Sequence, residues 1–375
     1  MRYSVVITTR FLPKVIEDFA RNIDLYGRKN DVEIIIIGDV KSPAESAEFV
    51  SGFSRNGFNF EYWDIQRQEE WLRQFPDLSA MIPYNSDNRR NIGYLLAYER
   101  GRECIVALDD DNYPTNDDYF AGHEKVGKRQ KAVTVRSNTG WFNVCDLLEI
   151  EGGVTVYPRG FPYKFRGLEH TKYDQFESEG DIVVNAGLWL GDPDVDAVTR
   201  LNNPVNAVDL KTENLMLDPS TNCPFNTQNT AFHRGILPSY YYVVMGYPLG
   251  SLKIDRYGDI WSSYLSRKVI DRMDGRVAFG IPLTRHLRHA HDLLKDLGQE
   301  YWGMVITNRL IDILSTINLE KDSYGGCYRE LSLALEEKVR ETEDFTEEVK
   351  SFFFMICKNM RIWVDICSDL EGRTK

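Results

Sequence analysis

Three consecutive aspartates are the strongest chemical signal in this sequence of 375 residues. Asp109, Asp110 and Asp111 directly follow Cys104–Leu108, an apolar run that predicts a buried strand. Neighbouring carboxylates repel one another, and a divalent cation such as Mg²⁺ or Mn²⁺ relieves that repulsion while it binds substrate phosphates. Because alternate side chains of an extended backbone share one side, we predict that Asp109 and Asp111 bind the cation and that Asp110 faces away.

Two alternatives for this acidic segment stay open. Asn112 and Pro114 are turn formers, so the segment is also compatible with a solvated acidic turn. A calcium loop would need regularly spaced oxygen ligands and a glycine at its sharp turn, and 109–118 contains no glycine.

A second group of possible ligands lies near the end of the middle region. Residues 286–291 hold three of the six histidines, without the cysteine or acidic pattern of a zinc site. We predict that His286 is a third metal ligand beside Asp111 and that Arg288 contacts a diphosphate. His289 and His291 are interpreted as structural or surface residues.

The residues before the aspartates alternate between strand and helix patterns. Strands are predicted at Tyr3–Thr9, Val32–Ile37, Phe58–Tyr62 and Cys104–Leu108, with helices between them. This order predicts βαβ units in an α/β, doubly wound sheet, and such sheets bind ligands beyond the carboxyl ends of their strands.

Polar residues stand at those strand ends. Thr8, Thr9 and Arg10 end the first strand, and Asp39 follows the second. Together with the aspartates, they predict one binding crevice at this edge of the sheet. The alternatives are an ordinary strand-to-loop exit for Thr8, Thr9 and Arg10 and a helix-capping or turn aspartate for Asp39.

Asp87 and Arg90 begin the helix before the fourth strand. An arginine near a helix N-terminus can bind a diphosphate with its planar guanidinium, and a surface ion pair is the alternative.

The rest of the chain divides into a loop-rich middle and a helical end. Short strands are predicted near 132–136, 181–190 and 278–281, and a helix over 259–273. Residues 344–368 carry a helical apolar stripe, and we expect the charged tail 369–375 to fray. We therefore divide the chain into a catalytic domain, 1–290, with a nucleotide half, 1–130, and a sugar and acceptor half, 131–290, followed by a helical region, 291–375.

Composition excludes several classes of protein. The net charge of −12 argues against nucleic-acid binding, which usually needs a basic surface. No apolar run approaches the roughly 20 residues of a membrane span. The six cysteines are dispersed and include no Cys-x-x-Cys pair, so we expect reduced thiols in a cytoplasmic protein.

A series of short motifs in a fixed order carries a family resemblance. It consists of Arg159–Arg166 (RGFPYKFR), Asn185–Leu190 (NAGLWL), Pro193–Thr199 (PDVDAVT), Phe225–Phe232 (FNTQNTAF), Arg256–Trp261 (RYGDIW) and Gly280-Ile281-Pro282 with His286. Together with Gly93-Tyr94 and the aspartates, this series resembles the reversibly glycosylated polypeptides, which include the UDP-arabinopyranose mutases. The aspartates themselves resemble the Asp-x-Asp motif of nucleotide-sugar glycosyltransferases of the GT-A fold.

The resemblance implies a GT-A, Rossmann-like mixed sheet, a UDP-sugar donor and Mn²⁺ or Mg²⁺ as cofactor. It implies that Thr8, Thr9, Arg10 and Asp39 hold the base and ribose, and that Asp87, Arg90, Asp109, Asp110 and Arg288 belong to the nucleotide and diphosphate site. It also implies an arginine that can carry the sugar covalently, which by position is Arg166.

Four further residues are assigned to the sugar and one to catalysis. Trp189 and Trp261 could stack on sugar faces, although buried core tryptophans are equally common. Asp194 and Asp196 are also assigned to sugar binding. Asp259, at a helix start, is interpreted as a general base or a ligand of sugar hydroxyls, with a helix-terminal aspartate as the alternative.

These observations predict a metal-dependent glycosyltransferase that cleaves the sugar–phosphate bond of a UDP-sugar. The acceptor would be a saccharide or a protein, and the chain could form a homo-oligomer. A UDP-sugar pyranose/furanose mutase that glycosylates itself on Arg166 is the first alternative. A scaffold that binds a nucleotide sugar without turnover is the second.

Overall fold

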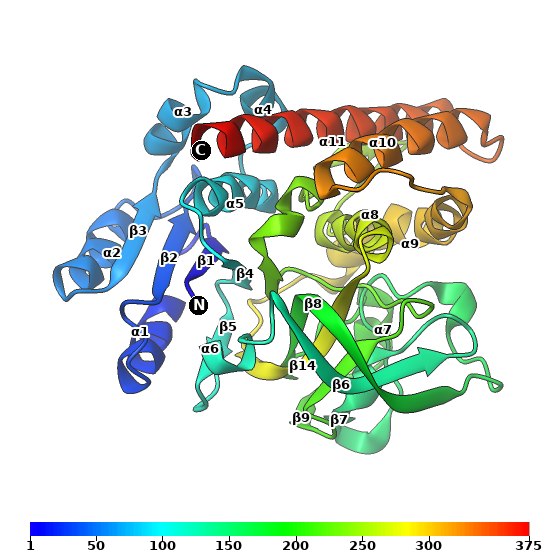
Figure 1. Cartoon of the computed structure of the whole chain (residues 1–375), viewed down its shortest axis with the longest axis horizontal. Coiled ribbons are helices and arrows are strands. Elements are labelled where there is room, and N and C mark those ends of the chain that lie inside the picture. Colours follow the sequence, from blue (N-terminus) through cyan, green and yellow to red (C-terminus); the bar gives the residue numbers. More distant parts are fainter. Residues whose placement is uncertain (375) are drawn as a thin grey trace.

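A computed structural model describes residues 1–374 of the chain. Within those residues, twelve strands form one sheet, with helices on both of its faces (Figure 1). Parallel strands make up the N-terminal part of the sheet, and antiparallel pairs follow, so the sheet is mixed.

The parallel part brings three strand ends to one edge. β1 (Tyr3–Thr8) lies between β2 (Val32–Ile37) and β4 (Cys104–Asp109), and β3 (Asn59–Trp63) pairs with the outer side of β2. Thr8 is level with the last residues of both neighbouring strands. The polar residues that follow these strands therefore start from the same line across the sheet.

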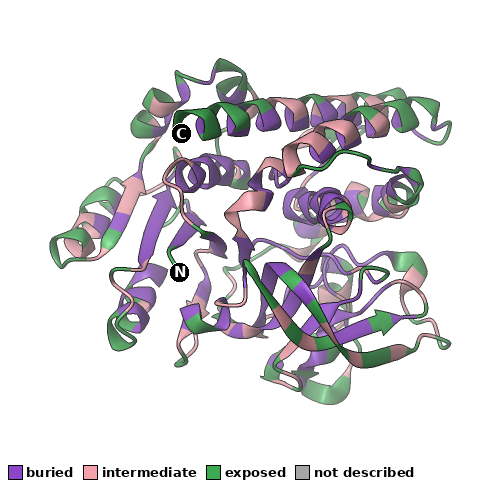
Figure 2. Cartoon of the chain, viewed as in Figure 1, coloured by how far each residue is buried: buried purple, intermediate pink, exposed green. Residues whose placement is uncertain are grey.

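Helices cover both faces of these strands because alternate apolar side chains enter different cores. In β1, Val5 and Ile7 belong to one buried cluster and Val6 to another. α1 (Val15–Leu25) and α2 (Ser46–Arg55) contribute to the first cluster, and α5 (Arg90–Glu99) contributes to the second. Figure 2 shows β1 and β2 as a buried band between the helices. The predicted doubly wound α/β class is confirmed.

The rest of the sheet contains pairs of both orientations. β11 (Asn229–His233) lies between β4 and β8 (Tyr173–Gly191) and is antiparallel to both. β8 also pairs with β6 (Lys128–Ser137) in antiparallel orientation and with β14 (Gly275–His286) in parallel orientation. The end of β14 pairs with β5 (Asn112–Pro114), with His286 opposite Asn112. This pairing carries His286 to the residue that follows the three aspartates.

Two strands extend beyond their predicted bounds. β8 begins at Tyr173 rather than near 181 because its polar first part forms an antiparallel ladder with β6. β14 runs from Gly275 to His286 although it contains glycine and Pro282, since its two ends have different partners.

The remaining elements are short connections between these strands and helices. They are α3 (Ile65–Leu72), α4 (Pro76–Met81), α6 (Tyr119–Gly122), α7 (Ala197–Asn202), β7 (Leu148–Ile150), β9 (Ala207–Leu210), β10 (Asn214–Leu217), β12 (Tyr247–Leu249), β13 (Leu252–Ile254) and the 3₁₀ turns Asp87–Arg89, Val144–Leu147, Glu151–Gly153, Tyr163–Phe165 and Arg234–Ser239.

The C-terminal region is helical, as predicted. α8 (Gly258–Arg272) precedes β14, and α9 (Leu293–Thr316), α10 (Tyr324–Glu341) and α11 (Glu347–Thr374) follow it. α11 returns across the molecule and ends beside α3 and α4 (Figure 1).

The expected fraying of the tail is wrong for 369–373, while residue 375 lies outside the described residues. Arg373 pairs with Asp369 at 2.6 Å, donates a hydrogen bond to Gln74, and lies 5.2 Å above the centre of the Phe75 ring. These contacts continue α11 to its end.

The close packing of α5 on the sheet at Gly93 predicts that a larger side chain there is destabilising. A Cβ atom there would lie 2.3 Å from Val6 Cγ1 and 3.2 Å from Ile37 Cγ1, so we expect Gly93→Ala to lower the free energy of unfolding by about 1–3 kcal/mol. The matched control is Gly52→Ala in α2, where the nearest atom is 3.8 Å away, and it should be stabilising by about 0.5–1 kcal/mol. Urea unfolding of both variants measures the difference, and equal effects would contradict this packing.

Candidate active site

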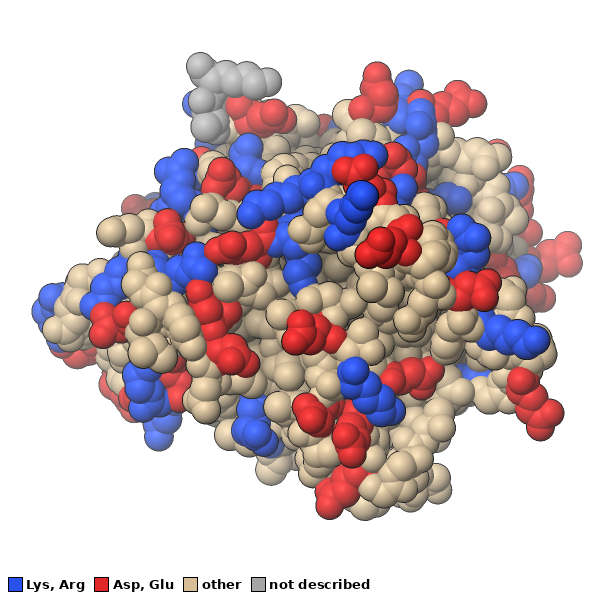
Figure 3. Space-filling view, turned by 60° about the horizontal axis from the view of Figure 1, so that its bottom comes forward, with Lys and Arg blue, Asp and Glu red and all other residues tan. Residues whose placement is uncertain are grey.

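A cleft of roughly 800 Å³ opens at the carboxyl ends of β1, β2 and β4. Its walls include the loops after these strands, the 3₁₀ turn that precedes α5, the end of β14 and the first turn of α9. Ten of the predicted site residues line it, namely Thr8, Thr9, Arg10, Asp39, Asp87, Asp109, Asp110, Asp111, His286 and Arg288. Acidic and basic side chains are interspersed over the face of the molecule in Figure 3, as they are along the cleft.

The three aspartates have three different partners. β4 ends at Asp109 and the chain turns before β5, so the side chains do not alternate as in a strand. Asp109 pairs with Arg90, and Asp110 accepts a hydrogen bond from Thr9.

Asp111 is buried and lies beside two side chains from the adjoining strand pair. His286 Nε2 is 3.3 Å from Asp111 Oδ2, and Asn112 Nδ2 donates to Oδ1 at 3.2 Å.

The residues that could hold a metal ion differ from the predicted set. Ligand atoms of Asp110, Asp111 and His289 lie within 4.8 Å of one another, whereas the prediction combined Asp109, Asp111 and His286. Asp110 takes part because the chain turns after β4. His289 Nε2 lies 3.3 Å from Asp110 Oδ1, so its interpretation as a structural or surface residue missed this approach.

The pKa values reflect these contacts. Burial raises the pKa of Asp109 to about 7, although Arg90 acts in the opposite direction. Burial also favours the neutral form of Asp111, but His286 outweighs it and the pKa of Asp111 is lowered. The hydrogen bond to Asp110 raises the pKa of His289. The pKa values of Asp109 and Asp111 are therefore shifted in opposite directions.

Arg90 lies beneath the cleft, and does not line it. Its guanidinium is 2% exposed and donates to Thr8 Oγ1 at 3.0 Å, to the Leu108 carbonyl at 3.1 Å and to the Thr227 carbonyl at 3.0 Å. Both Nη atoms therefore have protein partners, whereas Nε lacks an acceptor within residues 1–374. The predicted contact of Arg90 with a diphosphate stays a prediction.

Asp39 lines the cleft and also joins two loops. Its carboxylate accepts hydrogen bonds from the backbone N–H of Ser86 at 3.0 Å and of Val40 at 2.7 Å. The end of β2 is thereby connected to the loop that precedes α5.

Asp296 in the first turn of α9 holds the segment that carries the cleft histidines. It accepts hydrogen bonds from Arg288 at 2.7 Å and from His291 Nδ1 at 3.0 Å, and it lies 3.6 Å from Arg256. Sequence reasoning gave Asp296 no role, and Arg256 entered only as part of the Arg256–Trp261 motif. The hydrogen bond between His291 and Asp296 fits the interpretation of His291 as a structural residue. The signal for Asp296 was its place in the first turn of a helix that follows a histidine-rich segment.

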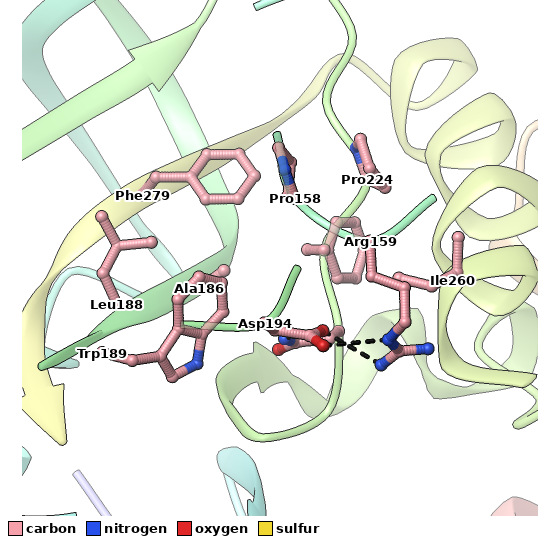
Figure 4. A pocket seen from close by; sticks show the side chains of 11 residues that line it. Pro158, Arg159, Ala186, Leu188, Trp189, Asp194, Pro224, Ile260 and Phe279 are labelled. Carbon is pink, nitrogen blue, oxygen red and sulfur yellow. Dashed lines mark hydrogen bonds and ion pairs between the residues drawn. The ribbon is translucent and has the colours of Figure 1, made fainter. Parts of the chain in front are cut away.

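Asp194 and Asp259 belong to a buried network outside the cleft. Arg159 donates to Asp194 at 2.9 and 3.0 Å (Figure 4) and to Asp259 at 2.7 and 3.0 Å, and Asn226 also donates to Asp194. The small cavity beside them, lined by Trp189, is only about 10 Å³ and can hold no more than one water molecule. The three side chains are enclosed in this structure, and their predicted roles at a sugar stay predictions.

Trp261 is a core residue in the structure. Its side chain is 1% exposed, stacks on Phe353 at 5.4 Å and donates to Thr307 at 3.0 Å. Trp261 packs in the core in this position, and its predicted stacking on a sugar stays a prediction.

Arg166 and Asp196 form a separate contact outside the cleft. Arg166 pairs with Asp196 at 2.7 Å, donates to the Phe161 carbonyl and lies 3.9 Å above the centre of the Tyr163 ring. Asp196 also accepts from the Thr199 N–H at 2.8 Å and caps α7. These contacts would have to break before Arg166 reached the cleft. The predicted sugar-binding role of Asp196 stays a prediction.

Further cleft residues were given no role by the sequence analysis. They include Tyr84, Arg89, Tyr242, Lys253 and Asp255, which lie outside the motifs of the family resemblance, and Gln228, which lies within the Phe225–Phe232 motif. Only tertiary contacts bring these positions together, so spacing along the chain gave no signal for them.

Most of the chain is similar in sequence to known proteins. A family model described as reversibly glycosylated polypeptide matches residues 30–371. UDP-arabinopyranose mutase 3 of Arabidopsis thaliana is 25% identical over 321 residues, which are 84% of this chain and 80% of that protein. UDP-arabinopyranose mutase 1 of Oryza sativa subsp. japonica is 25% identical over 322 residues, with 85% and 80% covered.

Solved structures with related folds are more distant. Residues 1–349 of S. aureus TarS, in complex with UDP-GlcNAc, give a TM-score of 0.43 at 11% identity, with all of this chain and 91% of that chain covered. Glucosyl-3-phosphoglycerate synthase from Mycobacterium tuberculosis, with Mn²⁺ and UDP-glucose, gives 0.40 at 12% identity, with 82% and 78% covered. The fold class of this chain therefore rests on its own sheet topology and not on these similarities. Within the described residues, no helix has the length and apolar character needed to cross a membrane.

We expect Asp259→Asn to affect stability rather than nucleotide binding. The substitution leaves Arg159 buried with half of its carboxylate partners, so the free energy of unfolding should fall by about 3–5 kcal/mol. Urea unfolding and titration with UDP measure the two effects. Loss of UDP binding in a variant that remains folded would contradict the structural role.

Asp109 predicts a pH dependence. In the unfolded chain an aspartate loses its proton near pH 4, whereas Asp109 in the folded protein retains its proton up to about pH 7. The contribution of Asp109 to the free energy of unfolding is therefore fully present below pH 4 and is lost as the pH rises to 7. We expect the difference in unfolding midpoint between pH 5 and pH 8, measured with a metal chelator, to be smaller in Asp109→Asn than in the wild type. Equal differences would contradict the raised pKa.

Proposed function

The chain belongs to the reversibly glycosylated polypeptide family, and on that basis we propose that it is a UDP-sugar mutase that interconverts the ring forms of a nucleotide-bound sugar. The cleft carries the proposal, because the strand-end residues Thr8–Arg10, Asp39 and Asp109–Asp111 line one space of nucleotide-sugar size. The relatives named UDP-arabinopyranose mutases support the reaction type. Transfer of the sugar to a separate acceptor begins with the same bond cleavage and is the second candidate.

We propose that Mn²⁺ or Mg²⁺ is held by Asp110, Asp111 and His289. Two carboxylates suit both ions, and the imidazole adds a third ligand atom within 4.8 Å. When bound, such an ion neutralises the diphosphate charge that grows as the sugar departs.

The basic residues of the cleft support the same leaving group. Arg10 lines the cleft, is exposed and forms no ion pair with any residue of 1–374. Arg288 is oriented by Asp296 and lines the cleft opposite the strand ends. In our proposal both guanidiniums bind diphosphate oxygens, because their planar forks match phosphate geometry.

The reaction exchanges two bonds at the anomeric carbon. The bond between the anomeric carbon C1 and the diphosphate oxygen breaks, and its electron pair stays on UDP. In the change from pyranose to furanose the C1–O5 ring bond breaks, O4 bonds to C1 and the O4 proton passes to O5, after which the same diphosphate oxygen attacks C1 again. Asp87 and Asp255 line the cleft as further carboxylates and suit the hydroxyls of a neutral sugar as hydrogen-bond acceptors.

The activity can be tested with UDP-arabinopyranose and Mn²⁺. We expect the purified protein to convert it to the furanose form, which chromatography separates. If the sugar of the substrate is radiolabelled, label found on an added saccharide or protein would instead favour a glycosyltransferase. Label retained on this protein and absent from Arg166→Lys would support the covalent alternative, and UDP binding without turnover would indicate a scaffold.

The metal proposal predicts a large effect of Asp111→Ala. We expect Mn²⁺ affinity, measured by calorimetry in the presence of UDP, to fall by more than about tenfold, since even residues that only support metal ligands have effects of this size. Asp344→Ala is the matched control, because that side chain is 76% exposed and lies outside the cleft. An unchanged Mn²⁺ affinity in Asp111→Ala would contradict the assignment.

A further inference from the structure

Two strongly exposed aromatic side chains line the cleft, and they differ in what covers them. Phe11 is 39% exposed, but its ring lies 4.4 Å from the ring of His289 and 5.0 Å from the Arg10 guanidinium carbon. Tyr84 is 49% exposed, and its ring is backed by Arg89. Tyr84 therefore presents aromatic surface to the cleft while its other contacts hold it in place.

Arg89 supports the Tyr84 ring from the protein interior. Its side chain is 2% exposed, and its guanidinium carbon lies 4.8 Å from the centre of the ring. Arg89 Nε donates to Gln68 Oε1 at 2.7 Å, and Gln68 in turn donates to the carbonyls of Gly38 and Trp63 at 2.8 and 2.6 Å. The ring is thus connected through two buried side chains to the ends of β2 and β3.

The charge of Arg89 has no carboxylate partner. Within residues 1–374 it forms no ion pair, its Nη2 lacks an acceptor, and burial lowers its pKa. A buried cation without a counter-ion is costly, and the negative face of an aromatic ring is the compensation that the structure provides. Such a cost is expected where the position of the ring matters.

Further contacts fix the position of Tyr84. Its hydroxyl donates to Glu69 Oε1 at 2.5 Å. The neighbouring Asn85 has a φ of +53°, a conformation that non-glycine residues seldom adopt. Ser86 is joined to Asp39, as described above. The ring is therefore ordered before a ligand arrives, which lowers the entropy lost on binding.

We propose that Tyr84 is the platform on which the nucleobase stacks, and that Arg89 is the residue that positions it. The inference rests on the proposed nucleotide-sugar function. The loop that carries Tyr84 is joined to the end of β2 by the hydrogen bond between Ser86 and Asp39, whereas two of the candidate metal ligands, Asp110 and Asp111, follow β4. The ends of β2 and β4 lie two strand spacings, or roughly 10 Å, apart across the sheet. Ribose and phosphate can bridge such a separation. The sugar, attached to the terminal phosphate, lies at the metal end, so the aromatic surface at the other end faces the base.

The test compares a ligand with a base and a ligand without one. Binding of UDP and of inorganic pyrophosphate, both with Mn²⁺, is measured by calorimetry. We expect Tyr84→Ala to weaken UDP binding by about 5- to 150-fold, the range for loss of one base–aromatic stack, and to leave pyrophosphate binding unchanged. Tyr84→Phe keeps the ring and should stay within about threefold of the wild type. Tyr301→Ala, a tyrosine that is 46% exposed outside the cleft, should change neither ligand.

The positioning role of Arg89 needs its own variants. We expect Arg89→Gln to weaken UDP binding several-fold and Arg89→Lys, which keeps the positive charge, to restore part of it. Pyrophosphate binding should be unchanged in both. A purely structural role would weaken both ligands alike and would not be rescued by lysine.

The outcomes distinguish this inference from the proposed function. If the wild type binds UDP and Tyr84→Ala binds it equally well, the platform is wrong and the proposed function stands. If the wild type binds UDP no more tightly than it binds pyrophosphate, the platform is also wrong. If the wild type binds neither ligand, both the inference and the proposed function fail. Photocrosslinking with 5-iodo-UDP gives independent evidence: an adduct on Tyr84 supports the platform, and an adduct on Phe11 overturns it.

Discussion

The buried guanidinium of Arg90 is the contact on which the cleft depends. It joins the ends of β1 and β4 and the segment before β11 through Thr8, Leu108 and Thr227, and it pairs with Asp109. Three adjacent carboxylates at a strand end are unfavourable unless each is compensated. Arg90 compensates the first from below, and the other two then turn toward the histidines of the β14 edge.

Two networks of charged side chains lie one behind the other at the cleft. The outer network lines the cleft and contains the aspartates, the histidines and Asp296. The inner network is buried behind it and is centred on Arg159. Arg159 also donates to the backbone carbonyl of Arg256, a residue held at a φ of +59°. The side chain of Arg256 contacts Glu300 and Asp296. The inner network therefore shapes the cleft from behind, and Asp259 contributes through Arg159 without contacting a ligand.

The sequence predicted the parts of the fold and site that repeat a local pattern. Apolar strands followed by helices indicated the parallel sheet, and polar residues at strand ends indicated the edge where the cleft lies. The turn after Asp109 was not predictable, because period-two alternation assumes that the strand continues. Trp261 and Asp194 were assigned to the sugar from a motif, but a motif does not distinguish a residue that contacts ligand from one that packs behind it. Tyr84 and Arg89 gave no signal, since their relation depends on a loop and on Gln68.

The path of α11 has a consequence for the order of folding. This last helix shares the core that contains α5, and its Trp363 donates to the Leu237 carbonyl at 2.7 Å. Apolar surface on the N-terminal half thus remains open to solvent until α11 has left the ribosome. Synthesis that stops before α11 would release a chain with part of its N-terminal half uncovered, a form that chaperones retain and that aggregates readily.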